Sequence, residues 1–106
     1  MHKVLQRSIF ILILFNKTIC FEWDEDKNQQ NIEKHGLSFE TAAKVFDDIS
    51  RIEIFDDMHS TDEDRYITIG LVNNVVFVIY TMRKNNIRII SARIANKEEE
   101  SLYYES

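Results

Sequence analysis

The sequence of 106 residues contains no proline, only two glycines and a single cysteine. Without a glycine-rich segment the chain lacks the phosphate-cradling loops of nucleotide-binding proteins. The lone Cys20 excludes an internal disulfide framework and gives no sign of an oxidising compartment. The length suits one domain with a single two-layer core, and the chain has no internal repeat.

A long segment in the second half of the chain lacks acidic side chains. Residues 65–97 contain no Asp or Glu, whereas residues 22–64 carry fourteen acids against four bases. The whole chain has a formal net charge of −5. A cationic segment in an acidic protein is typical of a surface that meets a polyanion or an acidic partner. Its bases are Arg65, Arg83, Lys84, Arg88, Arg93 and Lys97.

The first twenty residues allow two interpretations. Basic residues precede the apolar run 8–15, as in a secretory signal peptide. No small-residue cleavage site follows the run, and its eight residues are far fewer than the roughly twenty that a membrane-spanning helix needs. We therefore expect residues 1–20 to be an N-terminal extension and residues 21–106 to form the functional domain, without a membrane span.

Helix signals occupy residues 24–47. Asp24 can cap a helix that runs to about His35, where Gly36 supplies a left-handed stop. Ser38 can cap a second helix whose apolar residues are spaced i, i+3, i+4 and i+7, so that they form one stripe against a sheet. This stripe consists of Phe39, Ala42, Ala43 and Phe46.

Strand signals follow in residues 51–55, 65–72, 75–83 and 87–94. The link Asn73-Asn74 suits a tight hairpin, and Asn96 can cap a final helix with acids in its first turn. Consecutive strands with short links predict an α+β fold. We expect two N-terminal helices, a four-stranded antiparallel sheet and a C-terminal helix.

The predicted hairpin indicates where the bases meet. It brings Arg65 beside Arg83 at one end of the sheet, with Thr81 on the same face. In the last strand, simple alternation divides the polar residues between the two faces, unless a β-bulge changes the assignment. On this alternation Arg88 lies on one face, and Ser91 and Arg93 lie on the other.

Three motifs stand in fixed order: Phe21-Glu22-Trp23-Asp24, Lys34-His35-Gly36 followed by Phe39-Glu40, and Arg88-Ile89-Ile90-Ser91-Ala92-Arg93. In this combination residues 21 to about 105 resemble the BrnT family, the ribonuclease toxins of bacterial type II toxin–antitoxin modules. The resemblance implies a RelE-like fold, metal-independent RNA cleavage that arrests translation in the cytoplasm, and no cofactor. One position departs from the family pattern E-R-x-x-Y, because Glu100 follows Glu99.

The resemblance also implies partners. A BrnA-type antitoxin with a ribbon-helix-helix fold would neutralise the toxin in a heterotetramer. In such modules the complex usually represses its own promoter, and the antitoxin supplies the contacts to operator DNA. The alternative function is a non-catalytic module that binds an acidic protein or a nucleic acid through the same arginine and lysine side chains.

RNA can be cleaved without a metal when the ribose 2′-OH attacks the adjacent phosphate. Such a site needs a base, an acid for the leaving 5′-oxygen and cations for the phosphorane, a task that suits arginine. Histidine is the side chain that ordinarily titrates near neutral pH. The catalytic candidates are therefore Arg65, Arg83, Arg93, His35 and Thr81. The RNA-binding candidates are Lys34, Lys84, Arg88, Ser91 and Tyr103.

Several of these residues also have a purely structural interpretation. Lys34 and His35 would stabilise the carbonyls at a helix C-terminus without any catalysis, and a terminal tyrosine more often packs on a sheet. The carboxylates of loop 56–64 could hold Mg²⁺ or Ca²⁺, but their spacing fits no EF-hand. We expect a solvated loop without a metal, in which Glu63 pairs with a neighbouring arginine.

Overall fold

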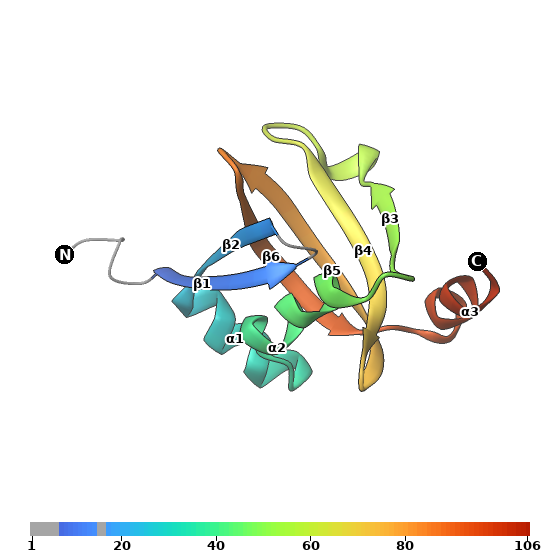
Figure 1. Ribbon diagram of the computed structural model, residues 1–106. Helices are drawn as coiled ribbons and strands as arrows, with labels where there is room; N and C mark the ends of the chain where they lie inside the picture. The colour runs from blue at the N-terminus through green and yellow to red at the C-terminus, as the bar shows by residue number, and fades with distance from the viewer. Residues whose placement is uncertain (1–6, 15–16) are drawn as a thin grey trace.

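The computed structural model describes residues 7–14 and 17–106, and their side chains from residue 19 onward. Two strands come first, β1 (Arg7–Leu14) and β2 (Lys17–Asp24). The helical segments α1 (Glu25–His35), α2 (Phe39–Ala42) and the 3₁₀ helix η2 (Ala43–Asp47) follow. The rest comprises β3 (Ile52–Phe55), the 3₁₀ helix η3 (Asp57–His59), β4 (Arg65–Val72), β5 (Asn74–Arg83), β6 (Asn86–Ile94) and α3 (Lys97–Glu105) (Figure 1).

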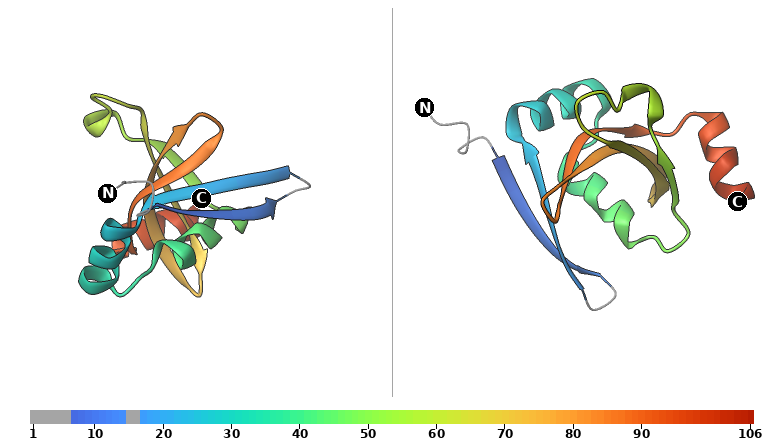
Figure 2. Two further views of the ribbon diagram at one scale, coloured as in Figure 1. Left: turned by 90° about the vertical axis from the view of Figure 1, so that its left-hand side faces the viewer. Right: turned by 90° about the horizontal axis from the view of Figure 1, so that it is seen from above.

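The described strands form one sheet in the order β1-β2-β6-β5-β4-β3. Four of the neighbouring pairs are antiparallel, whereas β2 and β6 run parallel, with Phe21 opposite Ile87 and Glu22 opposite Arg88. The β1–β2 hairpin extends away from the body of the sheet (Figure 2). Helix α3 lies beyond the other side of the sheet and contacts β4 and β5 (Figure 1).

The predicted class, α+β, agrees with the structure, but the predicted four-stranded antiparallel sheet is wrong. The sheet is mixed, and strands precede the N-terminal helices. Asp24 does cap α1, since its carboxylate accepts a hydrogen bond from the Asp26 N–H at 2.9 Å, but β2 runs directly into this cap. The parallel pair joins segments near opposite ends of the chain, and no local sequence pattern encodes such a pairing.

The second predicted helix is also shorter than expected. After one turn, α2 tightens into the 3₁₀ helix η2, as helix C-termini commonly do. The Ser38 hydroxyl caps α2 by accepting a hydrogen bond from the Thr41 N–H at 3.0 Å. The predicted apolar stripe is confirmed because all four of its residues are buried: Phe39, Ala42, Ala43 and Phe46.

The core lies between the sheet and the layer formed by α1, α2 and η2. Phe46 is packed between two aromatic rings, with its ring centroid 5.4 Å from that of Phe21 and 5.0 Å from that of Tyr80. These contacts tie β2, η2 and β5 together. The main core therefore occupies one face of the sheet.

A buried asparagine fixes α1 beside β6. The Asn31 amide donates to the carbonyl oxygens of Leu37 and Ala92, at 2.8 Å each, and its side-chain oxygen accepts from the Ala92 N–H at 3.3 Å. The side chain thus pairs with the backbone of β6 where the pairing with β2 has ended, so that buried polar groups are satisfied. As a result, the last turns of α1 lie against the middle of β6.

Candidate functional site

A β-bulge in β6 gathers the polar residues of the cationic segment on one face of the sheet. Ile79 of β5 lies opposite Ser91, but the next residue, Tyr80, lies opposite Ile89, so that Ile90 is an extra residue on β6. An extra residue reverses the alternation of the strand beyond it. Arg88 therefore shares the face of Ser91 and Arg93, contrary to simple alternation.

This face contains a row of polar residues across three strands. Arg65 of β4 lies opposite Thr81 of β5, and Thr81 lies opposite Arg88 of β6. Arg83 lies on the same face two residues beyond Thr81, so it is a diagonal neighbour of Arg65 at about 7–8 Å. The hairpin thus brings Arg65 and Arg83 to the same end of the sheet, as the sequence predicted.

Acids from other segments pair with three of the arginines. Glu63, from the loop before β4, lies 3.6 Å from Arg83, and both side chains are partly exposed. This is the pairing expected of Glu63. The buried Glu22 of β2 lies 3.5 Å from Arg88, and Glu99 of α3 pairs with Arg93 at 2.8 Å. At these three positions, glutamates from outside the cationic segment therefore largely neutralise its arginines.

Thr81 has a structural role in this row. It is 1% exposed, and its hydroxyl donates a hydrogen bond to the carbonyl oxygen of Asp64 at 2.6 Å. This bond fixes the end of the acidic loop next to Arg65. In this conformation Thr81 positions the backbone that carries Arg65, and its hydroxyl is withdrawn from solvent.

Arg93 anchors α3. Its guanidinium donates two hydrogen bonds to the Glu99 carboxylate, at 2.8 and 2.9 Å, and lies 4.0 Å from the centre of the Phe77 ring. The hydrogen bonds with Arg93 lower the pKa of Glu99 and raise that of Arg93. Glu99 also accepts from the Asn96 N–H and completes a capping box, so one carboxylate both starts the helix and docks it.

Tyr103 holds the other end of α3. Its hydroxyl donates to the Asp48 carboxylate at 2.6 Å, and this bond raises the pKa of Tyr103 to about 12. Burial tends to raise the pKa of Asp48, but hydrogen bonds from Tyr103 and the Leu71 N–H lower it overall. No residue of α3 is buried. The helix is therefore attached mainly by these polar contacts.

A polar pocket of about 260 Å³ lies between α1 and β6. It brings together three of the predicted site residues, Lys34 and His35 from α1 and Ser91 from β6. Lys34 is exposed, whereas His35 is half-buried. The other lining residues are Lys27, Gln30, Asn31 and Ile90.

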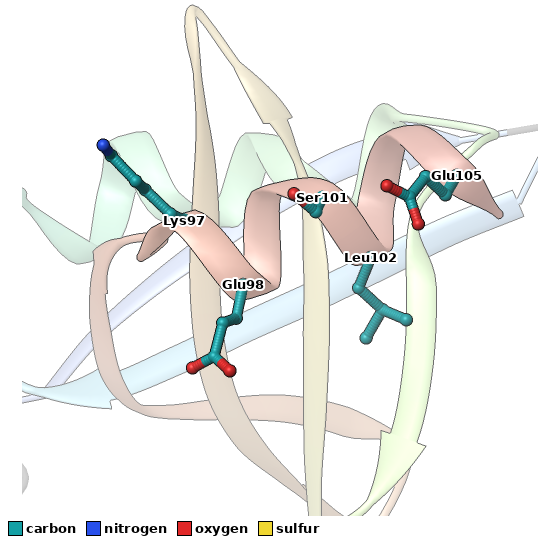
Figure 3. A pocket seen from close by; sticks show the side chains of 5 residues that line it. All are labelled: Lys97, Glu98, Ser101, Leu102 and Glu105. Atoms are coloured by element: carbon teal, nitrogen blue, oxygen red, sulfur yellow. The ribbon is translucent and has the colours of Figure 1, made fainter.

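Lys84 and Tyr103, two further predicted RNA-binding residues, do not line this pocket. Lys84 is exposed in the turn between β5 and β6, where its φ of 59° is left-handed. Tyr103 lies on α3. A larger pocket of about 370 Å³ lies along the same helix (Figure 3). The α3 pocket holds two acids and one base, and it contains none of the predicted site residues; its lining is Lys97, Glu98, Ser101, Leu102 and Glu105.

Sequence reasoning missed Lys27. The signal was present, because Lys27, Gln30, Asn31 and Lys34 follow the spacing i, i+3, i+4, i+7 of one helix stripe. The stripe was overlooked because it is polar, and the apolar periodicity that identifies a buried helix face does not apply to it. Only the position of α1 beside β6 gives the stripe a partner surface.

Within residues 7–14 and 17–106, no three His, Cys, Asp or Glu side chains are grouped as metal ligands would be. In the acidic loop, His59 instead pairs with Asp56 at 3.0 Å, and the Ser60 hydroxyl donates to the Asp56 carbonyl oxygen. Over the same part of the chain, no helix is both long and apolar enough to cross a membrane.

Comparisons with known proteins agree on one family. The family described as "Ribonuclease toxin, BrnT, of type II toxin-antitoxin system" matches residues 23–99. Among solved structures, the Brucella abortus ribonuclease toxin BrnT is 33% identical, with a TM-score of 0.56 over 71% of this chain and 94% of that one. A comparison with curated proteins gives no match.

Proposed function

Because the chain belongs to the BrnT family of ribonuclease toxins of type II toxin–antitoxin systems, we propose that it is a metal-independent endoribonuclease that arrests translation in the cytoplasm. A BrnA-type antitoxin neutralises it in a heterotetramer, and the antitoxin supplies the contacts between this complex and operator DNA. The activity belongs to residues 21–106, and residues 1–20 are an extension; N-terminal sequencing of the native protein tests this last point.

The observation that carries the proposal is the arginine row at one end of the sheet. Arg65, Arg83 and Arg88 share one face of three adjacent strands, on the side opposite the core. A guanidinium stays charged and matches two phosphate oxygens, so a group of arginines suits a phosphorane that carries extra negative charge.

The proposed reaction is attack of the ribose 2′-OH on the adjacent phosphorus, with departure of the 5′-oxygen. Arg65 and Arg83 stabilise the charge of the transition state, in which the 2′-OH loses its proton and the leaving 5′-oxygen gains one. His35 lies in the pocket between α1 and β6, too far along β6 to reach the same phosphate, and acts on a neighbouring nucleotide. Ser91 and Arg88 are three residues apart on β6, so about 10 Å of strand joins the pocket to the arginine row. A short single-stranded RNA can span both.

The ion pair of Arg83 and Glu63 provides the sharpest test. We expect Arg83→Ala to reduce the rate of RNA cleavage by about 10²–10³-fold, as for the loss of an aimed transition-state donor, and to relieve growth arrest. Glu63→Gln should keep or increase cleavage, because it frees the same guanidinium. The measurements are growth after induction and cleavage of RNA by the purified chain.

A merely structural ion pair would make both variants lose activity together, since each breaks the same contact. Both side chains are partly exposed, so both variants should remain folded by circular dichroism. If the unaltered chain neither arrests growth nor cleaves RNA in the absence of an antitoxin, the enzymatic proposal fails and the binding module remains. Cleavage that requires a divalent cation and stops with a chelator would refute metal independence.

A further inference from the structure

One basic residue of α1, Lys27, stands where the helix dipole disfavours a positive charge. Lys27 occupies the third position of α1, directly after Glu25 and Asp26. A base in the first turn opposes the helix dipole and costs about 0.3–1 kcal/mol. Helix-end electrostatics can explain Lys34 and His35 in the last turn, but they cannot explain Lys27.

The pocket that Lys27 shares with these residues contains bases without acids. None of its lining residues is Asp or Glu, although the chain is acidic overall. Within the part of the chain that the structure describes, Lys27, Lys34 and His35 take part in no ion pair. The arginines at positions 83, 88 and 93, by contrast, each have a carboxylate partner.

The remaining lining groups also suit an anion. Gln30 contributes amide hydrogens and Ser91 a hydroxyl, and both groups can donate to phosphate oxygens. Asn31 also lines the pocket, but its amide is already bonded to the backbone. The pocket thus offers two ammonium groups, an imidazole and neutral donors around a space of about 260 Å³.

We propose that the pocket between α1 and β6 is a backbone-phosphate subsite for single-stranded RNA and that Lys27 contacts the phosphate. The inference rests on the proposed function and adds a second anchoring point, away from the arginine row. Ser91 connects the two because it lines the pocket and stands on the arginine-bearing face of β6. Phosphates recur at regular intervals along RNA, so one strand can occupy both places.

An acidic protein partner fits the pocket less well. Protein interfaces are centred on apolar or aromatic anchors in desolvated pockets. Here the lining is mostly polar and Ile90 is its only apolar residue. Binding energy must therefore come from charge, which supplies most of a protein's affinity for a nucleic-acid backbone.

The test is the salt dependence of RNA binding. The probe is a fluorescent single-stranded RNA whose 2′-hydroxyls are methylated, so that it cannot be cleaved by 2′-OH attack. Its dissociation constant is measured for the full chain between about 50 and 200 mM salt. Lys27→Gln should lower the slope of log K against log salt by about 0.7, the value for one phosphate on a single strand. Affinity should fall about three- to ten-fold at low salt.

Lys44→Gln is the matched control. Lys44 is also an exposed helix lysine beside a pocket, but Asp47 and Asp48 line that pocket with it. Its removal should leave the slope unchanged. If the unaltered chain binds and cleaves RNA but Lys27→Gln keeps the full slope, this inference fails while the proposed function stands.

Failure of the unaltered chain to bind or cleave RNA would instead defeat the proposed function as well. Binding of a polyglutamate peptide tests whether the pocket holds an acidic polypeptide instead of RNA. If Lys27→Gln weakens polyglutamate binding and leaves RNA binding unchanged, the pocket serves an acidic polypeptide and the inference is overturned. Loss of RNA affinity in Lys27→Gln, with cleavage by the unaltered chain intact, supports the phosphate subsite.

Discussion

The attachment of α3 by charged groups can be tested at Glu99. Changing Glu99 to Gln removes the negative charge that faces Arg93 but keeps the shape of the side chain and an oxygen for the Asn96 N–H. Because no residue of α3 is buried, the helix has little apolar packing to compensate. We expect α3 to detach more often from β4 and β5 while the core remains folded.

The magnitude follows from the geometry of the pair. Hydrogen bonds to charged groups contribute about 1.5–3 kcal/mol when buried. Here the Glu99 side chain is 16% exposed, but the Arg93 side chain is 34% exposed, so solvent screening reduces the value to about 1 kcal/mol. An increase of this size in the free energy of docking corresponds to a change of about five-fold in the population of the open state.

Hydrogen exchange of the α3 backbone amides is the appropriate assay, because it reports local opening that a global unfolding curve would miss. Glu98→Gln is the control, since Glu98 lies one residue earlier, is exposed and forms no ion pair in the described structure. Both variants lose the same charge near the same helix N-terminus. Protection of the α3 amides should fall about five-fold more in Glu99→Gln than in Glu98→Gln.

The effect should depend on pH. Arg93 holds the pKa of Glu99 below its ordinary value in the folded state. A depressed carboxyl pKa contributes stability that is fully present above the unfolded value of about 4.3 and is lost as the pH falls through the folded value. The difference between the unaltered chain and Glu99→Gln should therefore be complete at neutral pH and shrink below about pH 4. Equal protection in the two Gln variants, or a difference independent of pH, would refute the assignment of Arg93 as an anchor.

Two further predictions concern the fold. Asn31→Asp should destabilise the domain by more than about 3 kcal/mol, because it buries a charge and removes two donors to carbonyl oxygens. The control Gln30→Glu should change the free energy of unfolding by no more than about 0.5 kcal/mol. Urea unfolding measures both variants, and similar midpoints would contradict the role of Asn31. Gly70→Ala should lower the free energy of unfolding by about 1–3 kcal/mol, because the added methyl group would lie 2.7 Å from Val45 Cγ2 and 3.0 Å from Arg51 Cβ. Thermal unfolding measures this change, and an unchanged melting temperature would contradict the expected steric clash.

Local structure was predictable wherever a few neighbouring residues control it. The Gly36 stop has the expected left-handed φ of 69°, and Asn96 and Glu99 form a capping box at the start of α3. The strands from β3 to β6 begin and end within a residue or so of their predicted limits. Caps, turns and strand alternation depend on chemistry within about one turn or one hairpin, and the sequence states that chemistry directly.

The candidate site was predictable only in part. The hairpin correctly brought Arg65 and Arg83 to the same end of the sheet. Its register differs by one residue from that of a two-residue Asn73-Asn74 link, because Asn74 pairs with Val72; this shift places Arg65 opposite Thr81 and so on the same face as Arg83. The bulge that turns Arg88 to this face does not follow from the sequence, since it depends on how β6 fits between β5 and its other neighbours. The stripe containing Lys27 was missed because helix α1 acquires its partner surface only when it packs beside β6.

The sequence alone determined the family, the α+β class and the cationic segment from which the arginine row is built. Tertiary structure decided which of those cations remain without an acidic partner. Glu22, Glu63 and Glu99 come from segments outside the cationic stretch and reach its arginines only after folding. Ionic contacts act through space over a few ångströms, whereas charge sorting along a sequence says nothing about which distant segments become neighbours.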